Sequence, residues 1–261
     1  MSEYIKKFKI DKYASFNREE RFWCFLLSHT LLTKSNARTK ILEFLEDEKI
    51  KLNTKNLEVY IETAILRDYW HYLKKLDEKN KTTEFKDMKR YIFLKDILSN
   101  KDHLNDVVID IDEIEKEENE FFKTVKGNIV NPSRWTEKKI LCISDQDKQK
   151  KLFYIKWAFN AKPDIMLMDE KSFVFIEAKL ESKEDKYKIK NTDIEATQTK
   201  IQGIIADIIS KYIFKNKNYK LILLSKDSGD LNWEQVKKEI MKSSSGIDNF
   251  TKKSFENTPY I

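Results

Sequence analysis

The apolar positions of this chain change their spacing near residue 125. Before that point they recur mostly at intervals of three and four residues, which is the period of an amphipathic helix. From residue 151 onward shorter apolar runs are separated by polar turns, as in β-strands. We therefore expect a helix-rich N-terminal region followed by a mixed α/β region.

The N-terminal region predicts a series of helices, over residues 17–32, 37–48, 54–78, 84–99 and 107–122. Asn17 suits the N-cap of the first helix, and Glu19 and Glu20 would lie in its first turn, where the helix dipole favours anions. The acidic run in the last of these helices is typical of a solvated helix face.

The C-terminal region predicts strands over 151–159, 164–168, 173–180 and 220–225, a helix over 194–214 and a closing helix over 233–241. Only four polar residues, Asp169 to Ser172, separate the second strand from the third, so we expect an antiparallel hairpin. The charged residues 181–193 are expected to form a loop. The fold class that follows is α/β, an α+β mixed sheet flanked by helices.

We divide the chain into three parts at its changes of composition. Residues 1–125 form a helical region that includes the first core helix (17–32) and a helical insertion between that helix and the sheet. Turn chemistry around Gly127 and Pro132 marks the start of the α/β core at 126–242, and residues 243–261 form a polar tail.

Composition and charge narrow the function classes. The hydrophobic content of 40% supports a proper core, and the formal net charge of +6 suits a polyanionic partner. A lysine-rich composition also arises from genomic base bias, so the charge alone does not name that partner. No apolar run approaches the length of a membrane span, and we expect no membrane partner.

The cysteines and histidines bear on location and on metals. Cys24 and Cys142, the only cysteines, lie in apolar surroundings and are expected to be buried free thiols of a cytoplasmic protein. None of the three histidines has a Cys or His neighbour at zinc-ligand spacing.

Two carboxylates and one amine stand out in the hairpin. Asp164 and Glu177 belong to apolar strands, where a charge is costly unless it is paired or binds a metal. Glu177 and Lys179 are two positions apart and share a face of their strand, and the hairpin can bring Asp164 beside Glu177. Hard oxygen ligands of this kind suit Mg²⁺ or Mn²⁺ rather than zinc.

These residues carry a family resemblance. Pro163-Asp164, followed by Glu177-Ala178-Lys179, resembles the active-site signature of the PD-(D/E)XK nuclease superfamily, which includes many restriction endonucleases. The resemblance covers about residues 150–230 and implies a restriction-endonuclease-like core behind a helix-rich N-terminal region. It extends to Glu20, with Glu19 as second choice, on the first helix, and to Gln198, with Gln202 one turn later, on the helix after the third strand.

The resemblance implies a role for each residue. Asp164, Glu177 and the Ala178 carbonyl would bind Mg²⁺, for which Mn²⁺ substitutes, and Glu20 would hold a second metal or a metal-bound water. Lys179 would orient or help deprotonate the attacking water. Gln198 would position Lys179 or the scissile phosphate.

The activity expected from this site is that of a metal-dependent endonuclease acting on DNA in a prokaryotic restriction or anti-phage defence setting. One alternative is a repair, recombination or transposition nuclease of the same superfamily. Another is a nucleic-acid-binding protein without turnover. A third is a surface hairpin in which Glu177 and Lys179 form an ion pair at the rim. The sequence does not decide whether the substrate is DNA or RNA, or whether the enzyme cuts within a strand or from its end.

The expected partner is nucleic acid, in particular double-stranded DNA. Basic residues follow the signature at Lys183, Lys186, Lys188 and Lys190 and could hold a phosphate backbone; a plain solvated loop is the alternative. A double-strand cut usually needs two sites, so a homodimer is possible.

Overall fold

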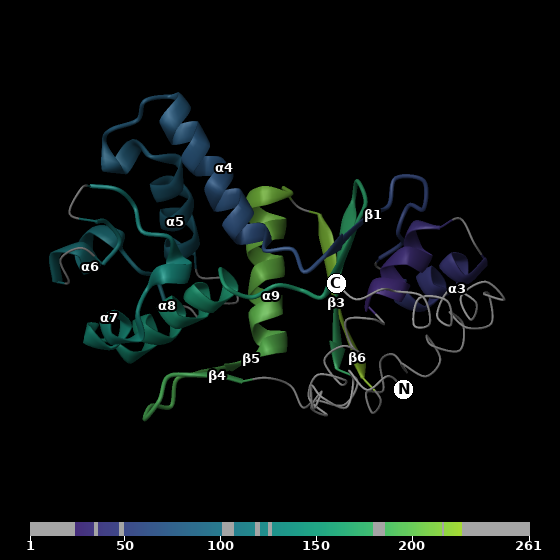
Figure 1. Ribbon diagram of the computed structural model, residues 1–261. Helices are drawn as coiled ribbons and strands as arrows, with labels where there is room; N and C mark the ends of the chain where they lie inside the picture. The colour runs from purple at the N-terminus through teal and green to yellow at the C-terminus, as the bar shows by residue number, and fades with distance from the viewer. Residues whose placement is uncertain are drawn as a thin grey trace, which may run out of the picture. The chain divides into compact units, whose positions relative to one another are not determined.

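The computed structural model describes residues 24–33, 36–46, 50–100, 107–117, 121–124, 127–179, 186–215 and 217–225 (Figure 1). The chain is mixed α/β, with a mixed sheet flanked by helices, which confirms the predicted class. It divides into two compact units. The sheet unit comprises Met1–Thr63, Pro163–Lys183 and Asn218–Ile261, and the helical unit comprises Ala64–Lys162 and Glu184–Lys217. These units differ from the division predicted at residue 125.

The sheet unit is built on four strands in the order β1-β2-β3-β6. Their bounds are Glu58–Ile61 for β1, Ile165–Met168 for β2, Ser172–Lys179 for β3 and Asn218–Ser225 for β6. The pairs β1–β2 and β2–β3 are antiparallel, and β3–β6 is parallel. The predicted hairpin is therefore present, and β6 lies at one end of this order.

Several predicted elements are wrong, among them the following two. The expected helix over 54–78 begins with strand β1 and becomes helical only at α4 (Ile65–Lys79), and the expected strand over 151–159 is helix α8 (Gln146–Ala158). In α8 the residues from Lys151 to Ile155 are all buried, so the apolar run carries no helical period. Asp145 caps α8 by accepting hydrogen bonds from the N–H groups of Asp147 and Lys148. The helical insertion consequently lies between β1 and β2, not between the first helix and the sheet.

One face of the sheet carries the core of its unit. Strand residues such as Ile165, Val174 and Ile176 pack against the helical residues 24–32 and against α3 (Asn36–Leu45) (Figure 1). Cys24 is part of this core, as expected. Cys142, the last residue of the short helix α7 (Glu137–Cys142), is exposed, contrary to expectation, on the side of the helix away from the buried Ile140.

The turn of the β2–β3 hairpin is organised by Asp169, whose side chain is buried. Its Oδ1 accepts hydrogen bonds from the N–H groups of Lys171 (2.8 Å) and Ser172 (2.7 Å). Its Oδ2 accepts one from the N–H of Asn53 at 2.6 Å. An aspartate that binds the backbone of its own turn in this way fixes the turn and, with it, the register of the two strands.

The helical unit contains α4, α5 (Lys89–Ser99), α6 (Ile111–Glu117), α7, α8, α9 (Gln198–Ile208) and the short helices η1 (Phe85–Asp87), η2 (Pro132–Arg134) and η3 (Ile209–Ile213). It also contains the hairpin of β4 (Lys186–Lys188) and β5 (Glu195–Thr197). The expected loop over 181–193 therefore includes strand β4. The helix expected over 194–214 begins only at Gln198, after strand β5. None of the helices in the described ranges is long and apolar enough to cross a bilayer.

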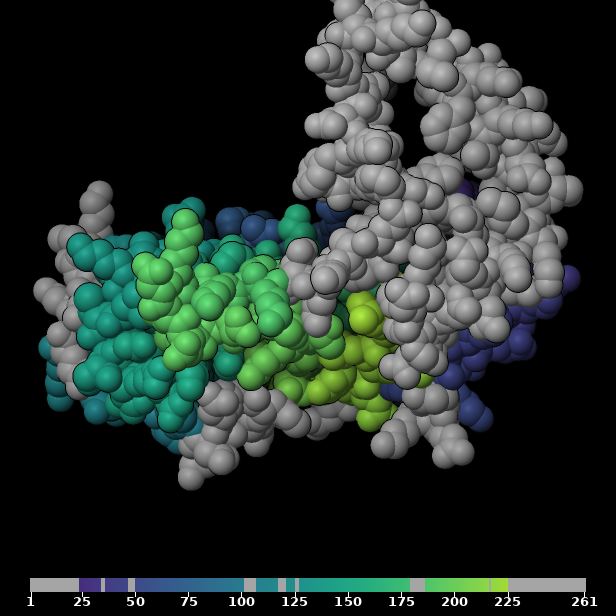
Figure 2. All heavy atoms as spheres, turned by 90° about the horizontal axis from the view of Figure 1, so that it is seen from below, coloured from purple at the N-terminus to yellow at the C-terminus, as the bar shows by residue number. Residues whose placement is uncertain are grey.

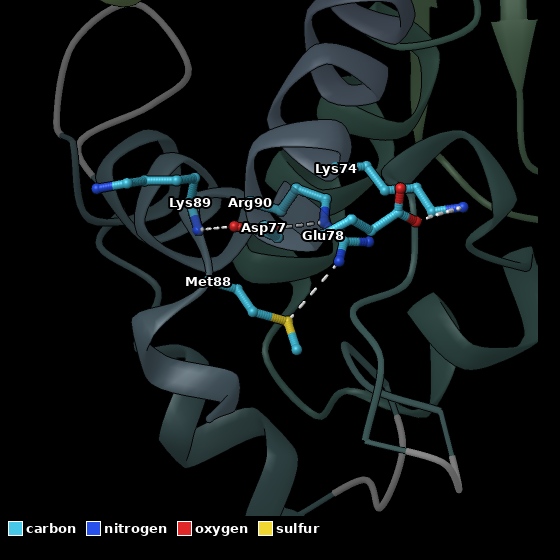
Figure 3. A network of polar contacts seen from close by, with 6 residues as sticks. All are labelled: Lys74, Asp77, Glu78, Met88, Lys89 and Arg90. Atoms are coloured by element: carbon cyan, nitrogen blue, oxygen red, sulfur yellow. Dashed lines mark hydrogen bonds and ion pairs between the residues drawn. The ribbon is translucent and has the colours of Figure 1, made fainter. Parts of the chain in front are cut away.

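A buried ion pair joins α4 to α5 (Figure 3). Arg90 Nε donates to Asp77 Oδ2 at 2.8 Å, with side-chain exposures of 6% and 2%. Asp77 Oδ1 also accepts from the N–H of Lys89, the first residue of α5, at 2.6 Å. The neighbouring pair Lys74–Glu78, at 3.5 Å, is exposed. The carboxylate of Asp77 thus neutralises a buried guanidinium and caps a helix at once.

Asp77→Ala should lower the free energy of unfolding by about 3–5 kcal/mol, because it leaves the buried Arg90 charge without its partner. Glu78→Ala, which breaks only the exposed pair, should lower it by less than about 1 kcal/mol. Urea unfolding followed by tryptophan fluorescence measures both values. Equal effects of the two substitutions would contradict this account.

A second buried charge lies in α8. The side chain of Lys151 is fully buried, and its Nζ donates to the carbonyl oxygens of Leu98 (2.7 Å), Asn100 (2.6 Å) and Val107 (2.5 Å). The contact with Leu98 reaches the last turn of α5, where the helix dipole favours a cation. Burial lowers the pKa of Lys151 from its ordinary 10.5 to about 8.

Stability should therefore depend on pH through Lys151. Between pH 8 and 10.5 the unfolded chain holds more protons at this residue than the folded chain, so the free energy of unfolding should rise with pH across that window. The rise is on the order of 3 kcal/mol. Lys151→Met removes the amine, so its free energy of unfolding should not show this rise. Urea titrations of both proteins from pH 7 to 11 compare the slopes, and parallel curves would disprove the assignment.

Candidate active site

The β2–β3 hairpin brings Asp164 and Glu177 face to face. The register pairs Ile165 with Ile176, and Asp164 and Glu177 are the next residues outward on each side, so they oppose each other. Asp164 Oδ2 accepts a hydrogen bond from the N–H of Ala178 at 2.8 Å. One carboxylate is therefore held against the neighbouring strand, directly beside the residue that bears the other.

The two carboxylates share one face of the sheet. Ile176 and Ala178 belong to the core of the sheet unit, so Glu177 between them points to the opposite face. Opposed residues of antiparallel strands point the same way, which puts Asp164 on the same side. Glu177 is only 7% exposed, whereas a carboxylate in an ion pair at a rim would be solvated. This burial argues against the purely structural surface hairpin.

The backbone of Asp164 is fixed from its other side by β1. The carbonyl oxygen of Asp164 accepts a hydrogen bond from the N–H of Glu62 at 3.0 Å, which extends the β1–β2 pairing one residue beyond Ile61 and Ile165. Glu62 has a φ of 47°, in the left-handed region, so the strand ends there. Sequence reasoning missed this contact, because it assigned the segment to a helix.

The two carboxylates, Asp164 and Glu177, are oxygen ligands of the kind that a hard cation with few protein ligands uses. Mg²⁺ is usually bound by one or two carboxylates, with waters and substrate phosphates completing its octahedron. Asp164 and Glu177 supply two such groups. Within the described ranges of the chain, no cluster of three or more His, Cys, Asp or Glu residues is arranged for a metal ion. These residues therefore do not form an all-protein metal cage, and the predicted Mg²⁺ or Mn²⁺ stays a prediction that is compatible with two carboxylates.

The remaining predicted site residues are only partly described. Lys179 is the last residue of β3 and pairs in register with Ser225, but its side chain is outside the described part of the structure. Glu20 and Glu19 are outside the described residues altogether, as is Lys183. Their predicted roles stay predictions.

Gln198 begins α9 and belongs to the helical unit, whereas Asp164 and Glu177 belong to the sheet unit. The side chain of Thr197 caps this helix by accepting from the N–H of Lys200. One turn after Gln198, Gln202 is buried and its Nε2 donates to the carbonyl of Lys162 at 3.3 Å. The predicted role of Gln198 also stays a prediction.

Three of the predicted nucleic-acid contacts lie in the β4–β5 hairpin. Lys186 and Lys188 are on β4 and Lys190 follows in the turn, and all three are exposed. Lys186 Nζ lies 3.4 Å from Glu195 Oε1 on the facing strand. From Lys186 onward, the structure thus has a defined β-hairpin where a loop was expected.

Comparisons with known proteins found no matching family model, no matching curated protein and no matching solved structure.

Proposed function

We propose that this protein is a divalent-metal-dependent nuclease that hydrolyses phosphodiester bonds, specifically a DNA endonuclease in a prokaryotic restriction or anti-phage defence setting. The observation that carries the proposal is the pair of carboxylates, Asp164 and Glu177, on opposed positions of two paired strands. One is held by a backbone hydrogen bond and the other is buried, so both occupy defined positions before any substrate arrives. Fixed oxygens of this kind suit metal-assisted phosphodiester chemistry.

The order of elements supports the same proposal. When α3, the helices between β1 and β2, the β4–β5 hairpin and η3 are set aside, the helical residues 24–32 are followed by β1, β2, β3, α9 and β6. The remaining elements are a helix, three strands, a helix and a strand. The resemblance to PD-(D/E)XK nucleases led us to expect this order, although the first strand is β1 and not the strand predicted over 151–159. Fold order alone does not establish an activity, so the proposal rests on the carboxylate pair.

Each residue would have a distinct task. The side chains of Asp164 and Glu177 and the carbonyl of Ala178 would hold Mg²⁺, with Glu20 as a further ligand. When bound, the metal supplies a lowered pKa for a coordinated water and offsets charge on the phosphate. Lys179 would orient the attacking water and stabilise the extra negative charge of the transition state. The water oxygen bonds to phosphorus, the ester bond to one sugar oxygen breaks, and that oxygen gains a proton.

A binding protein without turnover is the second candidate. The net charge of +6 favours contact with nucleic acid whether or not a bond is cut. The buried carboxylate of Glu177 favours the enzyme, because a carboxylate repels a phosphate backbone unless a cation lies between them.

Asp164→Asn, Glu177→Gln and Lys179→Ala should each reduce the rate of plasmid cleavage in Mg²⁺ by at least about 100-fold, since each removes a group from the chemical step. Glu43→Gln and Asp87→Asn are matched controls, because both side chains are exposed and lie outside the proposed site. Circular dichroism and thermal unfolding verify that the variants fold. Undiminished cleavage by Asp164→Asn would refute the assignment, and a wild type that binds but never cuts would favour the binding protein. Comparing the cleavage rates of duplex DNA, single-stranded DNA, branched DNA and RNA distinguishes a restriction enzyme from a repair nuclease.

Metal dependence gives an independent readout. EDTA should abolish cleavage, and Mg²⁺ or Mn²⁺ should restore it. Calorimetric titration with Mn²⁺ in the absence of nucleic acid should show weaker binding by Glu177→Gln, because one of two carboxylates is gone. Glu43→Gln should bind as the wild type does. Equal Mn²⁺ affinity in wild type and Glu177→Gln would contradict the proposed ligand set.

A further inference from the structure

The β4–β5 hairpin has two chemically different faces. Ile189 and Ile194 are 1% exposed and Ala196 is 4% exposed, and Tyr187 is half-buried. The alternate positions of the same ribbon are exposed and charged: Lys186, Lys188, Lys190 and Glu195. Successive side chains of a strand point to opposite faces, so the ribbon presents an apolar side inward and a charged side outward.

The inner side is packed against α8. Tyr187 stacks on Trp157, with ring centroids 4.3 Å apart and an interplanar angle of 25°. The amine of Lys156 lies 4.8 Å from the centroid of the Trp157 ring, which adds a cation–π contact. Tyr187 pairs in register with Ala196, which is buried beside it. This packing holds the ribbon in a fixed orientation on the helical unit.

The outer side carries an excess of amines. Lys188 and Lys190 form no ion pair with any residue in the described ranges, and Lys186 has only the exposed pair with Glu195, which contributes little. Within the hairpin the exposed acids are Asp193 and Glu195, against the three exposed lysines Lys186, Lys188 and Lys190.

We infer that the outer face of the β4–β5 hairpin is a docking surface for the phosphate backbone of double-stranded DNA. A two-stranded ribbon is of a size that the major groove of B-DNA admits. Lysines at alternate strand positions are about 7 Å apart, and each that meets a phosphate releases condensed counterions. Figure 2 shows the hairpin, in green, on the surface of the teal helices of its unit. The inference rests on the proposed function for its choice of DNA.

The test is equilibrium binding of the full chain to a fluorescent DNA duplex in EDTA, so that cleavage does not interfere, at several salt concentrations. Lys188→Ala/Lys190→Ala should weaken binding roughly 10- to 60-fold at about 0.1 M salt and reduce the slope of log K against log salt by about 1.8. Lys75→Ala/Lys79→Ala is the control, because it removes the same charge from exposed positions of α4. The control should differ from wild type by less than threefold.

A substitution in the opposite direction guards against loss of folding. Glu195→Gln removes the acid that pairs with Lys186, so it should tighten binding severalfold while Glu84→Gln, an exposed acid elsewhere in the unit, should not. A gain of affinity does not arise from a misfolded variant.

The outcomes separate this inference from the proposed function. If Lys188→Ala/Lys190→Ala binds no more weakly than its control, the docking surface is refuted, and the nuclease stands if Asp164→Asn still abolishes cutting. If the hairpin variants weaken binding but no cleavage is ever observed, the docking surface stands and the nuclease is refuted. A wild type that neither binds duplex DNA in EDTA nor cuts it in Mg²⁺ overturns both.

Discussion

The candidate site depends on the pairing of β2 with β3 in one register. Strand side chains alternate, so a shift by one residue would send Glu177 into the apolar core and bring Ile176 to the face that now bears the carboxylate. Asp169 fixes the turn at one end of the hairpin, and the hydrogen bond from the Ala178 N–H to Asp164 fixes the other. Structure and proposed chemistry therefore rely on the same few contacts.

The hairpin could be predicted because its signals are local. Two apolar runs separated by four polar residues leave little choice of connection, and Pro163 marks where the first strand begins. The placement of Asp164 beside Glu177 follows from that spacing. The remaining ligands and the amine of Lys179 stay predictions from the resemblance, because no short-range pattern fixes where they lie.

The elements that could not be predicted are set by distant contacts. Strand β1 has only four residues, and its partner β2 comes a hundred residues later, so nothing near Val59 indicates a strand. Helix α8 is buried around much of its circumference and shows no amphipathic period. Lys151 precedes its apolar run with a buried charge whose partners, the carbonyls of Leu98, Asn100 and Val107, lie on segments far away in the sequence.

The insertion between β1 and β2 also bears on how the protein folds. Bringing Ile61 beside Ile165 in an unstructured chain closes a loop of roughly a hundred residues, at an entropic cost of about 4 kcal/mol. The helical unit has its own core and ion pair, and once it is formed the length of free chain to be closed is much shorter. Asp164, which receives its backbone contact from the β1 side, would then acquire its final environment only at the last stage of assembly.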